Sequence, residues 1–190
     1  MKICCIADTH ETHRQCVVPD ADVLIFAGDG VSADFIDWIK GLPHEHKLIV
    51  GGNHDYGLQN RQSSLRKQLD PCVYLEDESH VIDGIKFYGA PWNNVVGWAF
   101  YANTDVMTHK WWDLIPDDVD ILITHTPPYH ILDKSSRGIH FGCPVLADRI
   151  KTLNFKYHVF GHVHANYGTQ DNFVNCSVCY DEAQPVVLEI

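Results

Sequence analysis

The chain has 190 residues, 45% of them hydrophobic, and a formal net charge of −11. This length suits one domain with a single core, which we place at residues 1–190, and the negative charge argues against binding long nucleic acid through its phosphates. The negative net charge is still compatible with binding of a small phosphorylated ligand. Because no charged leader precedes an apolar run and no apolar stretch nears the ~20 residues of a membrane span, we expect a cytoplasmic protein without a membrane partner. Composition leaves the oligomeric state open.

The seven cysteines form no recognisable disulfide framework. Several lie in apolar runs, as Cys4 and Cys5 do, which favours reduced core residues. The spacing of Cys176 and Cys179 is similar to a redox or zinc half-site, but no second pair accompanies it, and structural cysteines are the preferred interpretation.

Three apolar runs in the first part of the chain each end in polar residues whose side chains could take part in chemistry. Residues 2–7, 21–27 and 47–50 are predicted as buried strands. The side chains that follow them are Asp8 and His10, then Asp29, then Asn53, His54 and Asp55. Between the second and third strands, Ser32 is expected to cap a helix with an apolar face, so this part of the chain predicts a parallel βαβ unit. Each polar motif taken alone could also be an ordinary turn.

The middle of the chain predicts a different arrangement. A short helix is expected within residues 60–69, followed by a hairpin that turns at Asp83 and Gly84. The aromatic stretches 89–93 and 98–101 are interpreted as a pocket wall, with core packing as the alternative, and a helix is expected from Thr104 onward. Our candidates for substrate contacts are Tyr56, Trp92, Asn93 and Tyr129.

The last part of the chain repeats the pattern of strands that end in possible ligands. The strand predicted at 119–124 ends in His125, and the strand at 157–160 is followed by His162 and His164. A helix is expected at 145–153 and short strands near 173–174 and 186–190.

Eight side chains thus lie at or just after the ends of predicted strands. They are Asp8, His10, Asp29, Asn53, His54, His125, His162 and His164. A mixture of carboxylate, amide and imidazole suits two transition-metal ions with open positions better than magnesium, calcium or a closed zinc site. Two such ions can clamp a phosphate and activate water, which predicts a phosphoester hydrolase.

In this order the motifs resemble the signature of the calcineurin-like metallophosphoesterases. They are Asp8-x-His10, Gly28-Asp29, Gly52-Asn53-His54-Asp55, His125 and Gly161-His162-x-His164. Residues 89–92, 120–128 and 159–162 are most similar to its small MPPED-type branch, which is associated with class III cyclic nucleotide phosphodiesterases.

The resemblance implies an α/β fold, a four-layer αββα sandwich with mixed sheets and a dinuclear metal site at the carboxyl ends of the strands. One ion would take Asp8, His10 and His164, the other would take Asn53, His125 and His162, and Asp29 would bridge them. Hydroxide held by the metals would attack phosphorus in line, and His54 would act as general acid. Manganese is the expected metal, with iron, zinc and nickel also accepted by these ligands. The expected substrate is a small phosphodiester of the nucleotide type, with the base and the 2′,3′ or 3′,5′ linkage open.

The chain departs from the serine/threonine phosphatases of this superfamily after Asp29, where Gly30, Val31 and Ser32 replace the Asp and Arg of those enzymes. The arginines nearest the motifs are Arg14, Arg61 and Arg137. The absence of that Asp and Arg after Asp29 weakens the interpretation as a protein phosphatase. The alternatives are a phosphomonoesterase or nuclease with the same metals, and a nucleotide-binding pseudoenzyme.

Overall fold

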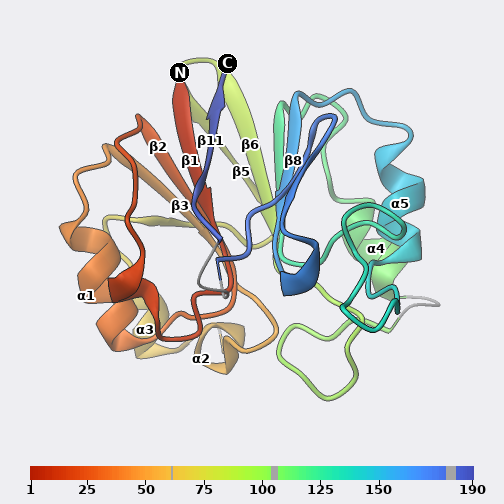
Figure 1. Cartoon of the computed structure of the whole chain (residues 1–190), viewed down its shortest axis with the longest axis horizontal. Coiled ribbons are helices and arrows are strands. Elements are labelled where there is room, and N and C mark those ends of the chain that lie inside the picture. The colour runs from red at the N-terminus through yellow and green to blue at the C-terminus, as the bar shows by residue number, and fades with distance from the viewer. Residues whose placement is uncertain (61, 104–106, 179–182) are drawn as a thin grey trace.

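The chain folds into two β-sheets that pack face to face, with helices on both outer faces (Figure 1). The computed structural model describes residues 1–60, 62–103, 107–178 and 183–190. Within that part of the chain, no helix is both long and apolar enough to cross a membrane.

In the described part of the chain the first sheet has five strands, and all but one of its neighbouring pairs run parallel. Its order is β11 (Val186–Glu189), β1 (Lys2–Ile6), β2 (Val23–Ala27), β3 (His46–Val50) and β4 (Val73–Tyr74). Only β11 pairs antiparallel, against β1. The strands β1, β2 and β3 are almost wholly buried, as their continuous apolar sequences predict. Their carboxyl ends therefore emerge at one edge.

The second sheet has six strands among the residues described, and its central strands run parallel. Its order is β5 (Glu78–Ile82), β6 (Ile85–Ala90), β7 (Ile121–Thr124), β8 (Tyr157–Phe160), β10 (Phe173–Asn175) and β9 (Gly168–Gln170). The predicted hairpin is confirmed: β5 and β6 pair antiparallel, and Asp83 and Gly84 turn the chain with φ of 48° and 82°. The carboxyl ends of β7 and β8 lie at the same edge of the molecule as those of the first sheet (Figure 1).

The helices are short and lie outside the sheets. They are α1 (Ala33–Gly41), α2 (Tyr56–Gln59), α3 (Ser64–Gln68), α4 (Met107–Trp112) and α5 (Pro144–Ile150), with 3₁₀ turns η1 (His13–Gln15) and η2 (His164–Asn166). The predicted cap of α1 is confirmed, since the Ser32 hydroxyl accepts a hydrogen bond from the amide of Phe35. The helices α1 and α3 flank the first sheet, and α4 and α5 flank the second (Figure 1).

Three apolar clusters correspond to the three interfaces of a four-layer structure. One lies between the sheets and includes Ile25, Val50 and Ile123. The second joins the first sheet to α1, and the third joins the second sheet to α4 and α5. The predicted αββα sandwich with mixed sheets is therefore confirmed.

The short helix expected within residues 60–69 is confirmed as α3, and Ser63 caps it, because its hydroxyl accepts a hydrogen bond from the amide of Leu65. Two other features differ from the prediction. The strands β4 and β9 were not expected, since two or three residues are too few for a periodic signal. Thr104 and Cys179 lie outside the described residues, and the six described cysteines are free.

A buried histidine of β8 makes the stability of the fold depend on pH. His158 is wholly buried, and its Nε2 lies 2.8 Å from the hydroxyl of Thr124. That hydroxyl donates its own proton to the carbonyl of Thr126 at 2.7 Å, so His158 donates to it from Nε2. Burial lowers the pKa of His158 to about 3, and the ring is therefore neutral in the folded protein at pH 7.

We expect the stabilising effect of His158 to fade as the pH drops below its unfolded pKa of 6.5. Between pH 6.5 and pH 3 the unfolded chain binds a proton there that the folded chain does not, which costs roughly 2 kcal/mol at pH 5. Urea unfolding at pH 7.5 and pH 5 should show the stability gap between wild type and His158→Gln narrowing by about that amount. The control is His80→Gln, at a partly exposed site, which should show no such narrowing. If the stability difference between wild type and His158→Gln is the same at both pH values, His158 is not the buried neutral group assigned here.

Candidate metal centre

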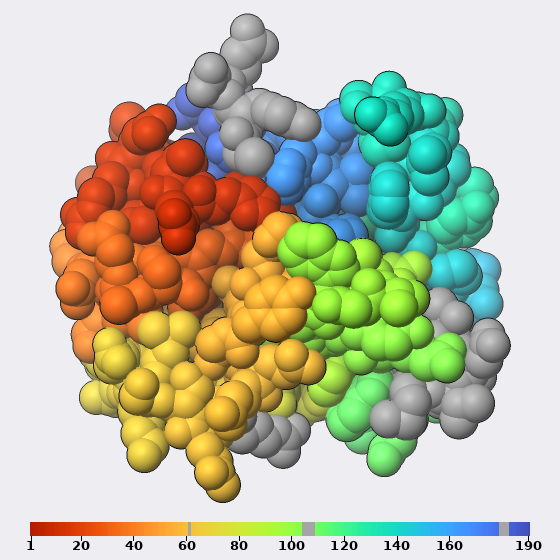
Figure 2. Space-filling model, turned by 90° about the horizontal axis from the view of Figure 1, so that it is seen from below, coloured from red at the N-terminus to blue at the C-terminus, as the bar shows by residue number. Residues whose placement is uncertain are grey.

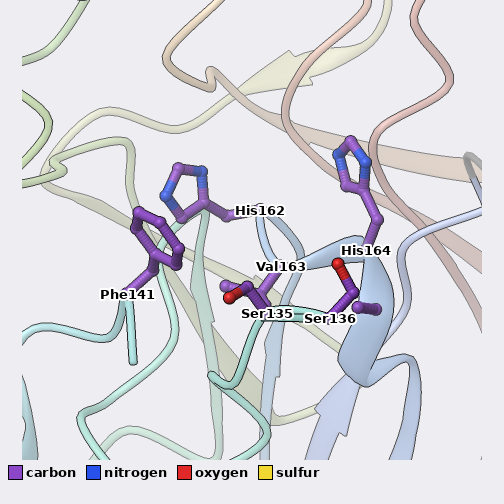
Figure 3. A pocket seen from close by; sticks show the side chains of 7 residues that line it. Ser135, Ser136, Phe141, His162, Val163 and His164 are labelled. Atoms are coloured by element: carbon purple, nitrogen blue, oxygen red, sulfur yellow. The ribbon is translucent and has the colours of Figure 1, made fainter. Parts of the chain in front are cut away.

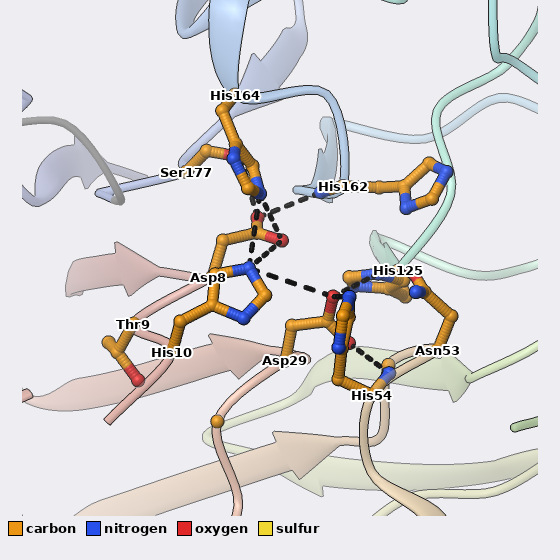
Figure 4. Close-up of polar contacts among 12 residues, drawn as sticks. Asp8, Thr9, His10, Asp29, Asn53, His54, His125, His162, His164 and Ser177 are labelled. Carbon is orange, nitrogen blue, oxygen red and sulfur yellow. Dashed lines mark hydrogen bonds and ion pairs between the residues drawn. The ribbon is translucent and has the colours of Figure 1, made fainter. Parts of the chain in front are cut away.

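The eight side chains predicted from the strand ends lie together at the edge where both sheets end (Figure 4). Asp8 and His10 follow β1, Asp29 follows β2, Asn53 and His54 follow β3, His125 follows β7, and His162 and His164 follow β8. The first sheet thus supplies both carboxylates and the amide, and the second supplies three imidazoles. Any ion bound among them would connect the two sheets.

The backbone turns sharply where these ligands leave their strands. Asp8, Asp29 and His162 have φ of 56°, 62° and 69°, in the left-handed region that non-glycine residues rarely adopt. Such strain persists when surrounding contacts impose it, and it gathers at functional sites. Close approach explains two glycines nearby: a Cβ at Gly52 would lie 2.3 Å from Asp29 Oδ1, and one at Gly161 would lie 2.2 Å from Asp8 Oδ2.

The first group of possible ligands contains Asp8, His10 and His164. One ligand atom from each lies within 4.8 Å of the others. The Nε2 atoms of the two imidazoles are 3.2 Å apart, and His164 Nε2 is 3.3 Å from Asp8 Oδ1. Asp8 Oδ1 is buried yet accepts no hydrogen bond within the described part of the chain. A buried oxygen without a donor beside two imidazole nitrogens fits a cation site.

The second oxygen of Asp8 is held by its surroundings. Oδ2 accepts hydrogen bonds from the hydroxyl of Ser177 at 2.6 Å and from the amide of His162 at 2.8 Å. Burial by itself would raise the pKa of Asp8, but the neighbouring imidazole of His164 and the charge on His125 lower it. The carboxylate is therefore ionised, with Oδ1 aimed into the site. Ser177 was not predicted, because nothing near position 177 in the sequence marks it as a partner of Asp8.

The second group contains Asp29, His125 and His162, whose ligand atoms also lie within 4.8 Å of one another. Asn53 joins it, since its Oδ1 is 2.9 Å from His125 Nε2. The other ring nitrogen of His125 lies 2.9 Å from the carbonyl of Ala27 and must donate to it, which leaves Nε2 to face the site. This backbone contact orients the imidazole as a metal ligand requires.

Asp29 lies between the two groups. Its Oδ2 is 3.4 Å from His125 Nε2, 3.8 Å from His54 Nε2 and 3.9 Å from His10 Nε2. Its Oδ1 accepts from the amide of His54 at 2.7 Å. Burial opposes ionisation, but His125 and these contacts lower the pKa of Asp29 well below its usual value. Burial by itself would lower the pKa of His125, but the charge of Asp29 and its contact with the ring outweigh burial and raise that pKa to about 9.

Asp55 organises the backbone beneath these ligands. Its buried carboxylate accepts four amide hydrogen bonds, from Asp29, Gly30, Val31 and Gly52, at 2.7–3.0 Å. Burial and the Asp29 charge raise the pKa of Asp55 to about 6, and the backbone amides oppose that rise, so the group is ionised at pH 7. Asp55 therefore fixes the loops after β2 and β3 together.

The four predicted substrate contacts lie in different surroundings. Tyr56 is exposed next to His54, and its hydroxyl donates to the carbonyl of Gly97. Trp92 stacks on Trp111 at 4.1 Å and donates from Nε1 to Asp77, which is a packing role. Asn93 is buried, and its side-chain amide makes hydrogen bonds within its own loop. Tyr129 packs against His130 beside a different cavity, next to α5.

Two cavities adjoin the candidate metal centre. One, of about 230 Å³, is lined by His162, His164, Phe141 and two serines, Ser135 and Ser136 (Figure 3). The other, of about 290 Å³, is lined by His10, His54, Asp55 and residues 30–32 with Glu11. Neither cavity is lined by a lysine or an arginine among the described residues. Arg14 pairs with Asp34 at 2.6 Å, Arg137 is exposed, and Arg61 is outside the described residues.

A mixed carboxylate, amide and imidazole site at the strand ends of an αββα sandwich defines the class of metal-dependent phosphoesterases. The sequence matches the family model described as calcineurin-like phosphoesterase over residues 1–166. The chain belongs to the calcineurin-like phosphoesterase family. It is therefore placed among hydrolases that act on phosphoric esters, and its His and Asp clusters suit divalent metal ions.

Curated relatives match along the whole chain. UPF0046 protein C25E10.12 of Caenorhabditis elegans is 34% identical and covers 100% of this chain and 81% of that protein. Metallophosphoesterase domain-containing protein 1 of Homo sapiens is 33% identical over 96% of this chain and 67% of that protein. One solved structure superposes with a TM-score of 0.67 at 16% identity, covering 92% of this chain and 89% of that one, which supports the fold.

Proposed function

We propose that the protein hydrolyses small phosphodiesters of the nucleotide type, cyclic nucleotides among them, with two divalent transition-metal ions, of which manganese is the first candidate. The observation that carries the preference for diesters is the lack of lysine and arginine among the described residues lining the two cavities at the site. A phosphate monoester is a dianion and gains from such cations, whereas a diester carries one negative charge.

The roles of the side chains follow from their positions. Asp8, His10 and His164 would hold one ion, Asn53, His125 and His162 the other, and Asp29 would contact both. When bound, the two ions would supply Lewis-acid activation of the phosphate and of the attacking water. His54 is the most exposed of the eight side chains at 43%, and its Nε2 faces Asp29 Oδ2 at 3.8 Å. Its imidazole can therefore reach a bound ester and give a proton to the leaving oxygen.

The first test compares bis-p-nitrophenyl phosphate with p-nitrophenyl phosphate on metal-stripped protein. Manganese, zinc, nickel or magnesium is added back separately, and bound metal is measured in each sample. Diester turnover that requires a transition metal is the expected result, and cyclic nucleotides are then the next substrates. Preference for the monoester would favour a phosphomonoesterase, and no turnover with two ions bound would favour a nucleotide-binding pseudoenzyme.

His54→Ala separates the acid from the metal ligands. We expect it to retain bound metal but to lose about 10²- to 10⁴-fold in rate on diesters with alkyl leaving groups, the usual contribution of a general acid. The loss should be much smaller with p-nitrophenolate, which leaves without protonation. His109→Ala, at an exposed helical histidine, is the matched control. Equal losses on alkyl and nitrophenyl esters would contradict the role of His54 as acid.

A further inference from the structure

An exposed tryptophan lies directly beside the histidine proposed as the acid. The indole of Trp98 has its centroid 4.3 Å from that of the His54 imidazole, and 38% of Trp98 is exposed. Tyr56, which is 53% exposed, has its ring centroid 6.4 Å from Trp98 at an interplanar angle of 32°. On the face where the strands end, the segments that carry Tyr56 (orange) and Trp98 (light green) lie side by side (Figure 2). Two accessible aromatic rings thus flank the site next to His54.

The loop that carries Trp98, residues 93–101, is fastened to the metal-ligand loop. The amide side chain of Asn93 donates to the carbonyl of Ala99 at 2.7 Å and accepts from the amide of Val95 at 3.0 Å, which closes the loop on itself. The amide of Ala99 donates to the carbonyl of Asn53 at 3.1 Å. The Tyr56 hydroxyl adds a bond to the carbonyl of Gly97 at 3.2 Å. The aromatic rings are therefore held in place relative to Asn53 and His54.

The position of these rings indicates which part of a substrate they meet. His54 gives its proton to the leaving oxygen, so the group attached to that oxygen lies next to His54 and its neighbour Trp98. An aromatic face near a phosphate site stacks well on a planar base and tolerates any base, because every base has a π-face. The rings are not needed to close the core, since Trp98 and Tyr56 belong to none of the three apolar clusters of described residues.

We propose that Trp98, with Tyr56 beside it, stacks the base of a nucleoside leaving group, which rests on the phosphodiesterase activity proposed above. Water adds to phosphorus and the bond between phosphorus and the nucleoside oxygen breaks. His54 gives a proton to that oxygen, and the proton released by the water passes to solvent. The products are a free nucleoside and the phosphate monoester of the other arm.

The methyl diesters of deoxyadenosine 5′-phosphate and 3′-phosphate test this directly, since either arm can leave. Loss of deoxyadenosine leaves methyl phosphate, and loss of methanol leaves the nucleotide. The ratio of the two products comes from one sample, so it does not depend on metal occupancy or on the fraction of active protein. We expect the wild type to release deoxyadenosine in excess from at least one ester.

In Trp98→Ala that ratio should fall roughly tenfold, the scale of one base stacked on an aromatic ring. Trp98→Phe should retain most of the preference. Val96→Ala, at a 74% exposed residue of the same loop, is the matched control and should leave the ratio unchanged. A wild-type ratio near one for both esters, or a ratio that Trp98→Ala leaves unchanged, would overturn the proposal.

Bis-p-nitrophenyl phosphate run in parallel separates the two proposals. If it is cleaved while neither nucleoside ester is, the stacking proposal fails and the phosphodiesterase proposal stands; if it is not cleaved with any metal, both fail. A second readout needs no turnover: deoxyadenosine 5′-phosphate should quench tryptophan fluorescence of the metal-loaded wild type and quench Trp98→Phe much less. Equal quenching in both proteins would contradict stacking on Trp98.

Discussion

Replacing Asp29 by alanine is expected to abolish phosphodiester hydrolysis and to remove at least one of two bound ions. Its Oδ2 faces imidazoles from both ligand groups at 3.4–3.9 Å. Among the described residues, Asp29 is the carboxylate that clusters both with His10 and His54 and with His125 and His162. The rate should fall by more than the 10- to 100-fold that loss of an outer partner of a metal ligand typically costs, so by about 10³-fold or more. Activity on bis-p-nitrophenyl phosphate and bound metal per chain are the measurements.

The matched control for this change is Asp37→Ala, which removes an exposed carboxylate from α1. It should retain both ions and normal turnover. Circular dichroism at the assay temperature checks that Asp29→Ala is folded. A folded Asp29→Ala protein with two ions and normal turnover would refute the bridging role.

Asp55→Asn is expected to have the largest effect on stability among changes outside the ligand set. The two carboxylate oxygens of Asp55 together accept four hydrogen bonds from backbone N–H groups. In the asparagine variant an NH₂ group, which is a donor, would replace one of these oxygens and would leave two N–H groups without an acceptor. Two buried amides without an acceptor cost roughly 1–3 kcal/mol each. A protein of this size loses about 2–4 °C of Tm per kcal/mol, so we expect a fall of roughly 4–24 °C.

The same change should weaken metal binding, because the bonds of Asp55 hold the backbone that carries Asp29 and Asn53. Thermal unfolding with and without metal separates the two effects. Asp20→Asn, at an exposed carboxylate, is the control and should shift Tm by at most a degree or two, as surface substitutions usually do. A normal Tm for Asp55→Asn would show that the four bonds contribute little.

Both sheets contribute to the site. The loops after β1, β2 and β3 bring both carboxylates, the amide oxygen and two imidazoles, and the loops after β7 and β8 bring three more imidazoles. Each proposed ion would take ligands from both sheets, so metal binding would stabilise the packing of one sheet on the other. The apolar cluster between the sheets holds this arrangement, and a metal ion bound at the candidate site would reinforce it.

The sequence by itself determined the main buried strands of both sheets and the residues that are candidate ligands at their ends. Continuous apolar runs predicted β1, β2, β3, β7 and β8, and each of these strands ends where a candidate ligand was expected. This works because buried parallel strands have a strong local signature, and because the carboxyl ends of parallel strands collect at one edge. The order of motifs then indicated the family, which the match over residues 1–166 shows.

Only the tertiary structure decided which residues support the ligands. Ser177 bonds Asp8 across 169 positions of sequence, and the carbonyl of Ala27 orients His125 across 98. The ring of Trp98 meets His54 because the amide of Ala99 bonds the carbonyl of Asn53. Such contacts have no local pattern, since a hydroxyl, a carbonyl or an exposed ring acquires its role only from what folding brings beside it.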